Sequence, residues 1–251
     1  MASFTCHYTS KVLEKDITLS VILPEGRKDG ERFRTLYLLH GYSGDHTSWI
    51  RQTSIERYAQ DKRIAVVMPD VQNSYYADMA HWYPYFTFMT DELVRMVHDT
   101  FPLSDKPEDT FVAGLSMGGY GAFKWALTHP ERFNKAASLS GALDVDEVAR
   151  GFDDNVRTRY MTAVFGDTTV KGTGHDLRHL ITEHKKAGRT LPGLFVGCGT
   201  EDFLYGTNRR FVDFLTDEGI SHTYRESEGA HTWGFWDTYI RYVLDWMFPN
   251  G

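Results

Sequence analysis

The chain has 251 residues and a net charge of −7, with 27 Lys and Arg against 34 Asp and Glu. Apolar residues make up 41% of it and aromatic residues 14%, which excludes an intrinsically disordered protein. The acidic balance disfavours a nucleic-acid partner, because affinity for a phosphate backbone needs clustered Lys and Arg.

The cysteines and the N-terminus indicate a compartment. Cys6 and Cys198 are too few for a disulfide framework, and no CxxC pair suggests a zinc ribbon. The first residues lack a basic segment followed by an apolar one, and the apolar runs are too short to span a bilayer. We therefore expect a cytoplasmic protein with no membrane partner.

Strand patterns start near the N-terminus, and no linker divides the chain, so we expect residues 1–251 to form one domain. Apolar and polar residues alternate over 17–23, which predicts a strand with one solvated face. Continuous apolar runs are typical of a parallel sheet covered on both faces. These runs lie at 36–39, 64–68, 111–113, 136–139 and 194–196. No helical pattern separates the first two strands, so we expect them to form an antiparallel edge.

Helical patterns lie between the later strands, at 93–101, 122–127 and 211–215, and a last one covers 236–247. This alternation predicts an α/β fold with a doubly wound, mostly parallel sheet and helices on both faces.

Two stretches, 71–90 and 144–190, interrupt the alternation, and we expect them to lie over the active site at the strand ends. The first is rich in Tyr and Trp, which suits either an apolar wall for substrate or a small core under a long loop. The second carries Phe152, Tyr160 and Phe165 and is a candidate for a partial lid.

The sequence GLSMGG at 114–119 carries the clearest chemical signal. It follows an apolar strand and precedes a helix, the context in which GxSxG presents a nucleophilic serine on a tight turn. Larger side chains two residues to either side of Ser116 would clash in such a turn, and the helix N-terminus favours developing negative charge. We predict that Ser116 is the nucleophile; a glycine-rich turn with an incidental serine is the alternative.

A nucleophilic serine needs a histidine base and an acid that orients the base. His231 lies in a loop between the last predicted strand, 223–226, and the final helix. Asp202 follows the strand at 194–196 and two glycines, which suits the chain order serine, acid, histidine. We predict His231 as the base and Asp202 as the acid, with Asp144, after the preceding strand, as the competitor.

Developing negative charge on the substrate oxygen needs backbone donors. One donor should be the N–H of Met117, directly after the nucleophile. The other should come from the loop HGYSG at 40–44, where we choose the N–H of Tyr42, with Gly41 as the next candidate.

Three segments together resemble the esterase D family, and within it the small tributyrin esterases. They are LLHGYSG at 38–44, GLSMGGYGA at 114–122 and GAHTWGFW at 229–236. The resemblance implies an α/β-hydrolase fold, a Ser116–Asp202–His231 triad and oxyanion donors at Tyr42 and Met117. It further implies hydrolysis of short-chain acyl esters without a cofactor, and we assign substrate contacts to Gly41 and Trp233.

Larger members of the same group widen the functional range. They include S-formylglutathione hydrolases, feruloyl and acetylxylan esterases, and mycolyltransferases, so a thioesterase or an acyltransferase stays the alternative. The resemblance also leaves a homo-oligomer open.

One pattern imitates a metal site. His175-Asp176-Leu177-Arg178-His179 resembles the HExxH motif, and on a helix its two histidines would share one face. His184 would fall on the opposite face, so we read the segment as a solvated, charged helix and expect no metal. No phosphate-binding glycine loop suggests a nucleotide.

Overall fold

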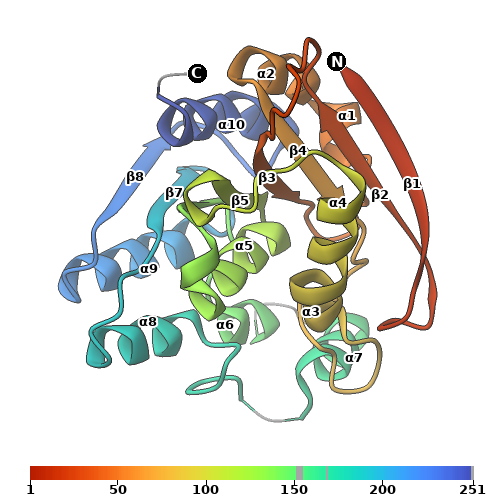
Figure 1. Ribbon diagram of the computed structural model, residues 1–251. Coiled ribbons are helices and arrows are strands. Elements are labelled where there is room, and N and C mark those ends of the chain that lie inside the picture. The colour runs from red at the N-terminus through yellow and green to blue at the C-terminus, as the bar shows by residue number, and fades with distance from the viewer. Residues whose placement is uncertain (151–154, 168, 250–251) are drawn as a thin grey trace.

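The computed structural model describes residues 1–150, 155–167 and 169–249. Their centre is one eight-stranded sheet with the order β1-β2-β4-β3-β5-β6-β7-β8 (Figure 1). The strands are β1 (Ala2–Ser10), β2 (Lys15–Leu23), β3 (Arg34–Leu39), β4 (Ile64–Pro69), β5 (Thr110–Leu115), β6 (Lys135–Leu139), β7 (Gly193–Gly199) and β8 (His222–Ser227). Strands β3 to β8 are parallel, so the predicted doubly wound, mostly parallel sheet is confirmed.

Helices cover both faces of the sheet. One face packs against α1 (Ser48–Gln52), α2 (Ile55–Lys62) and α10 (Trp233–Met247). The other packs against α3 (Tyr85–Thr87), the π-helical turn η1 (Phe88–Leu93), α4 (Val94–Thr100), α5 (Met117–Thr128), α8 (Leu177–Lys186) and α9 (Tyr205–Asp217). The remaining helical segments are α6 (Val145–Arg150), α7 (Asn155–Phe165) and the short turns η2 (Pro107–Asp109) and η3 (Pro130–Arg132).

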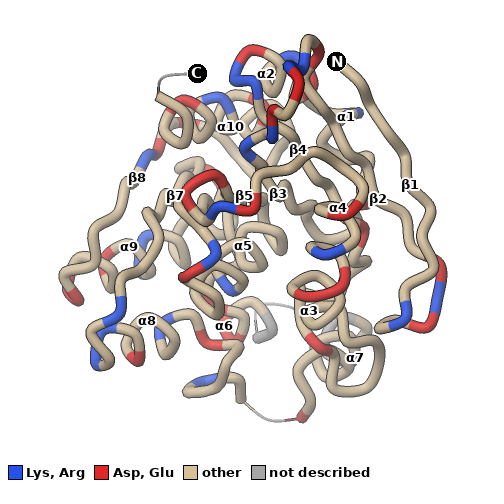
Figure 2. Tube along the Cα trace, viewed as in Figure 1, with Lys and Arg blue, Asp and Glu red and all other residues tan. Residues whose placement is uncertain are grey.

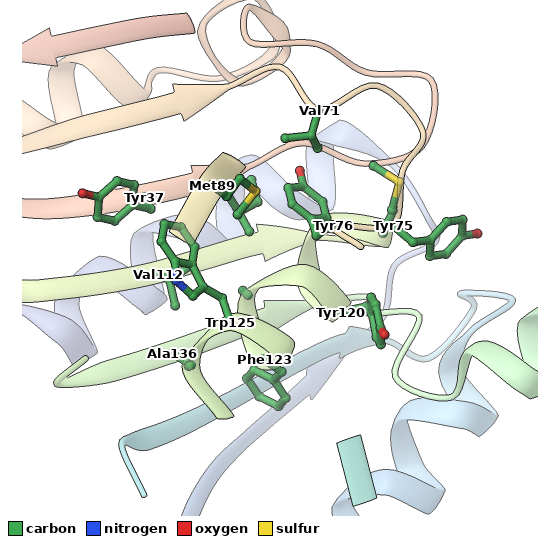
Figure 3. Close-up of a cluster of buried hydrophobic side chains, with 14 of the residues drawn as sticks. Tyr37, Val71, Tyr75, Tyr76, Met89, Val112, Tyr120, Phe123, Trp125 and Ala136 are labelled. Carbon is green, nitrogen blue, oxygen red and sulfur yellow. The ribbon is translucent and has the colours of Figure 1, made fainter. Parts of the chain in front are cut away.

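Burial on both faces explains the continuous apolar runs. In β3, Leu36 and Leu38 belong to the core under α10, whereas Tyr37 and Leu39 belong to the core under α5. Successive side chains of a strand point to opposite faces, so a strand covered on both sides must be apolar at every position. Figure 3 shows part of the core on the α5 side, where Tyr37 and Val112 of the sheet lie near Trp125 and Phe123 of the helix.

The antiparallel edge differs in detail from its prediction. Strand β2 pairs antiparallel with β1 and β4, so the expected pairing between the strands at 17–23 and 36–39 is wrong. Strand β1 was not predicted, although Phe4, Cys6 and Tyr8 alternate in it with polar residues. Strand β3 lies inside the sheet, between β4 and β5, where helices cover both of its faces.

One buried carboxylate fastens the β1–β2 hairpin to the rest of the fold. Glu92 of η1 accepts hydrogen bonds from the Ser10 hydroxyl, from the backbone N–H groups of Lys11 (2.8 Å) and Val12 (3.1 Å), and from the Tyr8 hydroxyl (3.0 Å). Burial by itself raises the pKa of this carboxyl, but the four hydrogen bonds outweigh it and hold the pKa below its usual range. The hairpin therefore depends on an ionised Glu92.

The imitation metal motif does not lie on one helix. Helix α8 begins at Leu177, and Asp176 is its N-cap, with a carboxylate oxygen 3.0 Å from the N–H of Arg178 and 3.3 Å from that of His179. His175 precedes the helix, so the predicted shared face of His175 and His179 is wrong. In the part of the chain that the structure describes, no three His, Cys, Asp or Glu side chains come together in a way that would hold a metal ion.

Charges of both signs are mixed over the molecule. Figure 2 shows acidic and basic residues close together at the turn between β1 and β2 and along α2. Some form ion pairs, such as Lys62 with Asp245 at 2.9 Å. The lack of a nucleic-acid partner stays a prediction.

The helices of the described ranges include none whose length and apolar character would suit a membrane span.

Candidate active site

Ser116 lies on a strained turn between β5 and α5. Its backbone has φ 54° and ψ −118°, far from the regions that side chains prefer. Such strain costs of the order of 1–3 kcal/mol and persists where the surrounding structure imposes it. The turn places the serine at the N-terminus of α5, where the helix dipole favours negative charge.

The neighbouring glycines are needed because backbone segments touch there. A Cβ at Gly114 would lie 2.3 Å from the carbonyl oxygen of Gly118, and a Cβ at Gly118 would lie 2.4 Å from that of Leu39. Moving either backbone atom would cost free energy, so glycine is required at both positions. The GxSxG spacing therefore reflects the close packing of β5, α5 and the end of β3.

His231 reaches Ser116 from the loop between β8 and α10. Its Nε2 lies 3.0 Å from the serine Oγ, within hydrogen-bond range. The imidazole stands edge-on to Trp236, with ring centroids 4.8 Å apart, and it also contacts the ring of Phe203, at 4.5 Å. Two aromatic neighbours thus restrict the imidazole.

Asp202 approaches the same imidazole from the loop after β7. Nδ1 of His231 lies 2.8 Å from Oδ2 and 3.0 Å from Oδ1 of Asp202, which is 5% exposed. The two loops meet because neither has a side chain at the crossing: a Cβ at Gly199 would lie 2.0 Å from the carbonyl oxygen of Gly229. A hydrogen bond of 3.0 Å from the N–H of Glu201 to that oxygen ties them together.

Asp144, the competing acid, has a different environment. Its Oδ1 accepts a hydrogen bond of 3.0 Å from the N–H of Glu147, which caps α6. It lines a separate cavity beside α8 and does not line the cleft at Ser116. The structure therefore brings Ser116, His231 and Asp202 together and leaves Asp144 outside.

The loop 40–44 presents a peptide group beside Ser116. A Cβ at Gly41 would lie 2.5 Å from Leu115 and 3.4 Å from the Cβ of Ser116, so only glycine lets this loop come so close. The carbonyl oxygen of Gly41 lies 2.8 Å from Nδ1 of His40 and 3.0 Å from the N of Gly44. In a trans peptide the C=O and N–H point in opposite directions, so the N–H of Tyr42 faces away from these partners.

The second expected donor, the N–H of Met117, belongs to the first residue of α5. The first N–H groups of a helix have no partner within the helix, which suits them to bind an oxyanion. Both predicted donors therefore flank the Ser116 turn.

A cleft of about 560 Å³ opens over the serine. Of the predicted site residues, Gly41, Tyr42, Ser116, His231 and Trp233 line it. Asp202 and Met117 do not line it. Tyr75 from the segment 71–90 and Tyr160 from the segment 144–190 also line the cleft, whereas Phe152 lies outside the described residues.

Among the lining residues that were not predicted, Phe203 and Arg51 bear most on the chemistry of the cleft. Phe203 is 69% exposed and packs on His231; its position directly after Asp202 is the only signal in the sequence that points to it. Arg51, in the last turn of α1, is the one Lys, Arg, Asp or Glu among the described residues that line the cleft. No sequence pattern marks it, because it reaches the cleft only through the packing of α1.

Comparison with known proteins identifies the family of this chain. Residues 10–241 match the family model "Esterase", described as "Putative esterase". The acetyl esterase of Caldicellulosiruptor saccharolyticus is 36% identical over 262 residues, which cover 98% of each chain.

Two solved structures from Staphylococcus aureus are similar over 98% of both chains. The substrate-bound fluorophosphonate-binding serine hydrolase F (FphF) is 37% identical with a TM-score of 0.93. The apoenzyme of an S-formylglutathione hydrolase (FrmB) is 36% identical with a TM-score of 0.89. The sheet and its helices are therefore an α/β-hydrolase fold, as the resemblance implied.

Proposed function

Because the chain belongs to the esterase family and is a carboxylic ester hydrolase, we propose that it hydrolyses short-chain acyl esters through an acyl-enzyme on Ser116. The observation that carries this proposal is the position of His231, between the Ser116 hydroxyl at 3.0 Å and the Asp202 carboxylate at 2.8 Å. A nucleophile, a base and an orienting acid in hydrogen-bond contact are what acyl transfer needs.

Acylation follows from this arrangement. Nε2 of His231 takes the proton of Ser116 as Oγ forms a bond to the ester carbonyl carbon. The carbonyl oxygen becomes an oxyanion, which the N–H groups of Tyr42 and Met117 stabilise. Asp202 accepts a hydrogen bond from Nδ1 and stabilises the imidazolium. The tetrahedral species then collapses, and His231 gives the proton to the leaving alcohol.

Deacylation repeats the same steps with water. His231 removes a proton from water, the hydroxide oxygen bonds to the acyl carbon, and Ser116 leaves with the proton. The acid product is released and the enzyme is restored. No step needs a cofactor.

Covalent labelling tests the nucleophile. An organophosphonate should add one adduct, which peptide mapping should place on Ser116. Ser116→Ala should lose the adduct, and its kcat should fall about 10⁶-fold if the three residues act as a unit. Thr232→Ala serves as the control, because this hydroxyl residue also lines the cleft, next to His231, but is not one of the three. Labelling that persists in Ser116→Ala would sink the proposal.

A second candidate function is the hydrolysis of thioesters whose thiol carries a carboxylate. One observation favours it: Arg51 lines the cleft, and its Nε donates a 2.7 Å hydrogen bond to Thr47, which orients the guanidinium. Asp45 lies 3.5 Å from Nη2, and the arginine is still 57% exposed. A guanidinium binds carboxylates in a two-pronged geometry, and glutathione carries two carboxylates.

Matched substrates separate the two candidates. We would compare kcat/KM on S-formylglutathione and on p-nitrophenyl acetate in Arg51→Met and in Arg57→Met, an exposed arginine of α2 outside the cleft. The thioesterase candidate expects Arg51→Met alone to lose about tenfold on the thioester, since a charged hydrogen bond contributes 1.5–3 kcal/mol. Equal rates for both variants on S-formylglutathione would contradict it.

A further inference from the structure

Two adjacent tyrosines in the loop after β4 have unusual backbones. Tyr75 has φ 50° and Tyr76 has φ 52°, a region that bulky side chains rarely adopt. Both are buried, Tyr76 completely. Figure 3 shows the two rings pointing apart, with the hydroxyl of Tyr76 toward Val71. Such paired strain persists only where several contacts impose it.

Helix α5 supplies most of those contacts. The Nζ of buried Lys124 donates a 3.1 Å hydrogen bond to the carbonyl oxygen of Tyr76. The tyrosine ring lies directly on the helix, since a Cβ at Gly121 would be 2.3 Å from it. The N–H of Tyr76 donates to Ser74 at 3.2 Å. The helix that begins after Ser116 therefore holds Tyr76 in place.

The hydroxyl of Tyr76 connects helix α5 to the loop at Gly41 through hydrogen bonds. It donates a 2.8 Å hydrogen bond to the carbonyl oxygen of buried His40. Nε2 of that histidine accepts from the N–H of Val71 at 3.2 Å, so Nδ1 carries the ring proton and donates to the carbonyl oxygen of Gly41 at 2.8 Å. Burial lowers the pKa of His40, which keeps the ring neutral in this role.

The end of this chain of bonds is the peptide between Gly41 and Tyr42. Its carbonyl oxygen is held by His40, and its N–H is the proposed oxyanion donor on the opposite side. A shift of about 1 Å in such a group can cost about 10²-fold in rate. A displacement of His40 would therefore displace the N–H of Tyr42 and lower the rate.

We propose that Tyr76 is a positioning residue for ester hydrolysis: its hydroxyl, held by Lys124 and α5, fixes His40 and thereby aims the N–H of Tyr42 at the oxyanion. The inference rests on the proposed acyl-enzyme on Ser116. Tyr76 itself does not line the cleft, so we assign it no contact with substrate.

Tyr76→Phe tests the proposal, because it removes one oxygen and keeps the ring. We would measure kcat and KM on p-nitrophenyl acetate and the Ki of a short-chain trifluoromethyl ketone. The serine Oγ adds to the ketone carbonyl, whose oxygen becomes an anion in the donor site. We expect kcat to fall about 10- to 100-fold. That loss is no larger than the loss of about 10²- to 10³-fold on removal of one oxyanion donor. KM should stay within twofold, and Ki should rise in proportion to the fall in kcat.

Tyr120→Phe is the matched control. This tyrosine of α5 is also fully buried, and its hydroxyl donates to the carbonyl oxygen of His175 at 2.9 Å. Both variants lose one hydrogen bond from the hydroxyl of a buried tyrosine to a backbone carbonyl oxygen, so both should lower Tm. Only Tyr76→Phe should change kcat and Ki. Rates are divided by the fraction of enzyme that an organophosphonate labels, so that unfolded protein does not count.

The outcomes separate the two proposals. A Tyr76→Phe enzyme that loses Tm but keeps kcat and Ki within twofold of wild type would overturn the positioning role and leave the acyl-enzyme proposal intact. Equal losses of kcat in Tyr76→Phe and Tyr120→Phe would also overturn it, since a general loosening of α5 would explain both. Failure of the acyl-enzyme proposal would show separately, as full activity of Ser116→Ala.

Discussion

Asp202 offers both carboxylate oxygens to one nitrogen of His231, at 2.8 and 3.0 Å from Nδ1. Oδ1 also accepts a 2.8 Å hydrogen bond from the N–H of Leu204, which restricts the rotation of the carboxylate. The imidazole is therefore oriented with Nε2 toward Ser116 before any substrate binds.

Asp202→Asn should lower kcat about 10⁴-fold, because the amide keeps the size but removes the charge and can select the wrong imidazole tautomer. Asp144→Asn is the control: this carboxylate caps α6 and should affect stability more than rate. Steady-state kinetics of both variants, with folding checked by circular dichroism, decides between them. If Asp144→Asn lost most of its kcat while Asp202→Asn kept a kcat near that of wild type, the assignment of the acid would be wrong.

Gly118→Ala should damage both activity and stability. The new Cβ would lie 2.4 Å from the carbonyl oxygen of Leu39 and 2.6 Å from that of His40, so α5 must move away from β3 and take Ser116 with it. We expect a loss of at least about tenfold in kcat and a Tm lower by several degrees, as overpacking typically costs about 1–3 kcal/mol.

Gly234→Ala is the matched control for that change. Gly234 lies in the first turn of α10 with nothing within 4 Å of an added Cβ, so the same substitution should be neutral or slightly stabilising. Thermal unfolding and p-nitrophenyl acetate kinetics measure both variants. Wild-type kcat and Tm in Gly118→Ala would show that the Ser116 turn tolerates a side chain at position 118.

The rate on p-nitrophenyl esters should peak between acetyl and butyryl and decline for longer acyl chains. The ring of Tyr42 packs against those of Tyr75 and Tyr160, with centroids 6.2 and 5.9 Å apart, and all three line the cleft beside Ser116. We expect these rings to limit the length of the acyl chain that fits beside Ser116. A kcat/KM profile over acyl lengths tests this, and a maximum at decanoyl or longer would contradict it.

Glu92→Gln should destabilise the protein in a pH-dependent way. The pKa of Glu92 is lowered in the folded state, so its stabilisation is present above the unfolded pKa of about 4.3 and is lost as the pH falls through the folded pKa. The variant should therefore unfold at a lower Tm than wild type at pH 7, and the difference should shrink below about pH 4.

Glu14→Gln provides the comparison, because Glu14 is an exposed residue of the same hairpin. We expect no difference from wild type at any pH. Thermal melts between about pH 3 and about pH 8 compare the three proteins. This interval includes the ordinary pKa of a carboxyl group, about 4. A Tm difference for Glu92→Gln that is constant with pH would mean that its charge does not matter.

Local sterics made the Ser116 turn readable from the sequence alone. The two required glycines, 114 and 118, lie within five residues of sequence, so this short stretch is enough to predict the turn. The continuous apolar runs predicted β3 to β7 for a similar reason, since burial on both faces dictates each position of the strand. The place of His231, after the last strand and before the last helix, followed from chain order.

Long-range packing decided the rest. Asp202 and Asp144 both follow parallel strands, so the sequence favoured Asp202 but left Asp144 open as the competitor. The backbone contact between Gly199 and Gly229 brings only Asp202 to the imidazole. The pairing of β2 with β4 depends on a partner far along the chain, as do the approach of Arg51 to the cleft and the bond from Tyr76 to His40. Such contacts draw their free energy from many residues of two segments at once, so no short window of sequence encodes them.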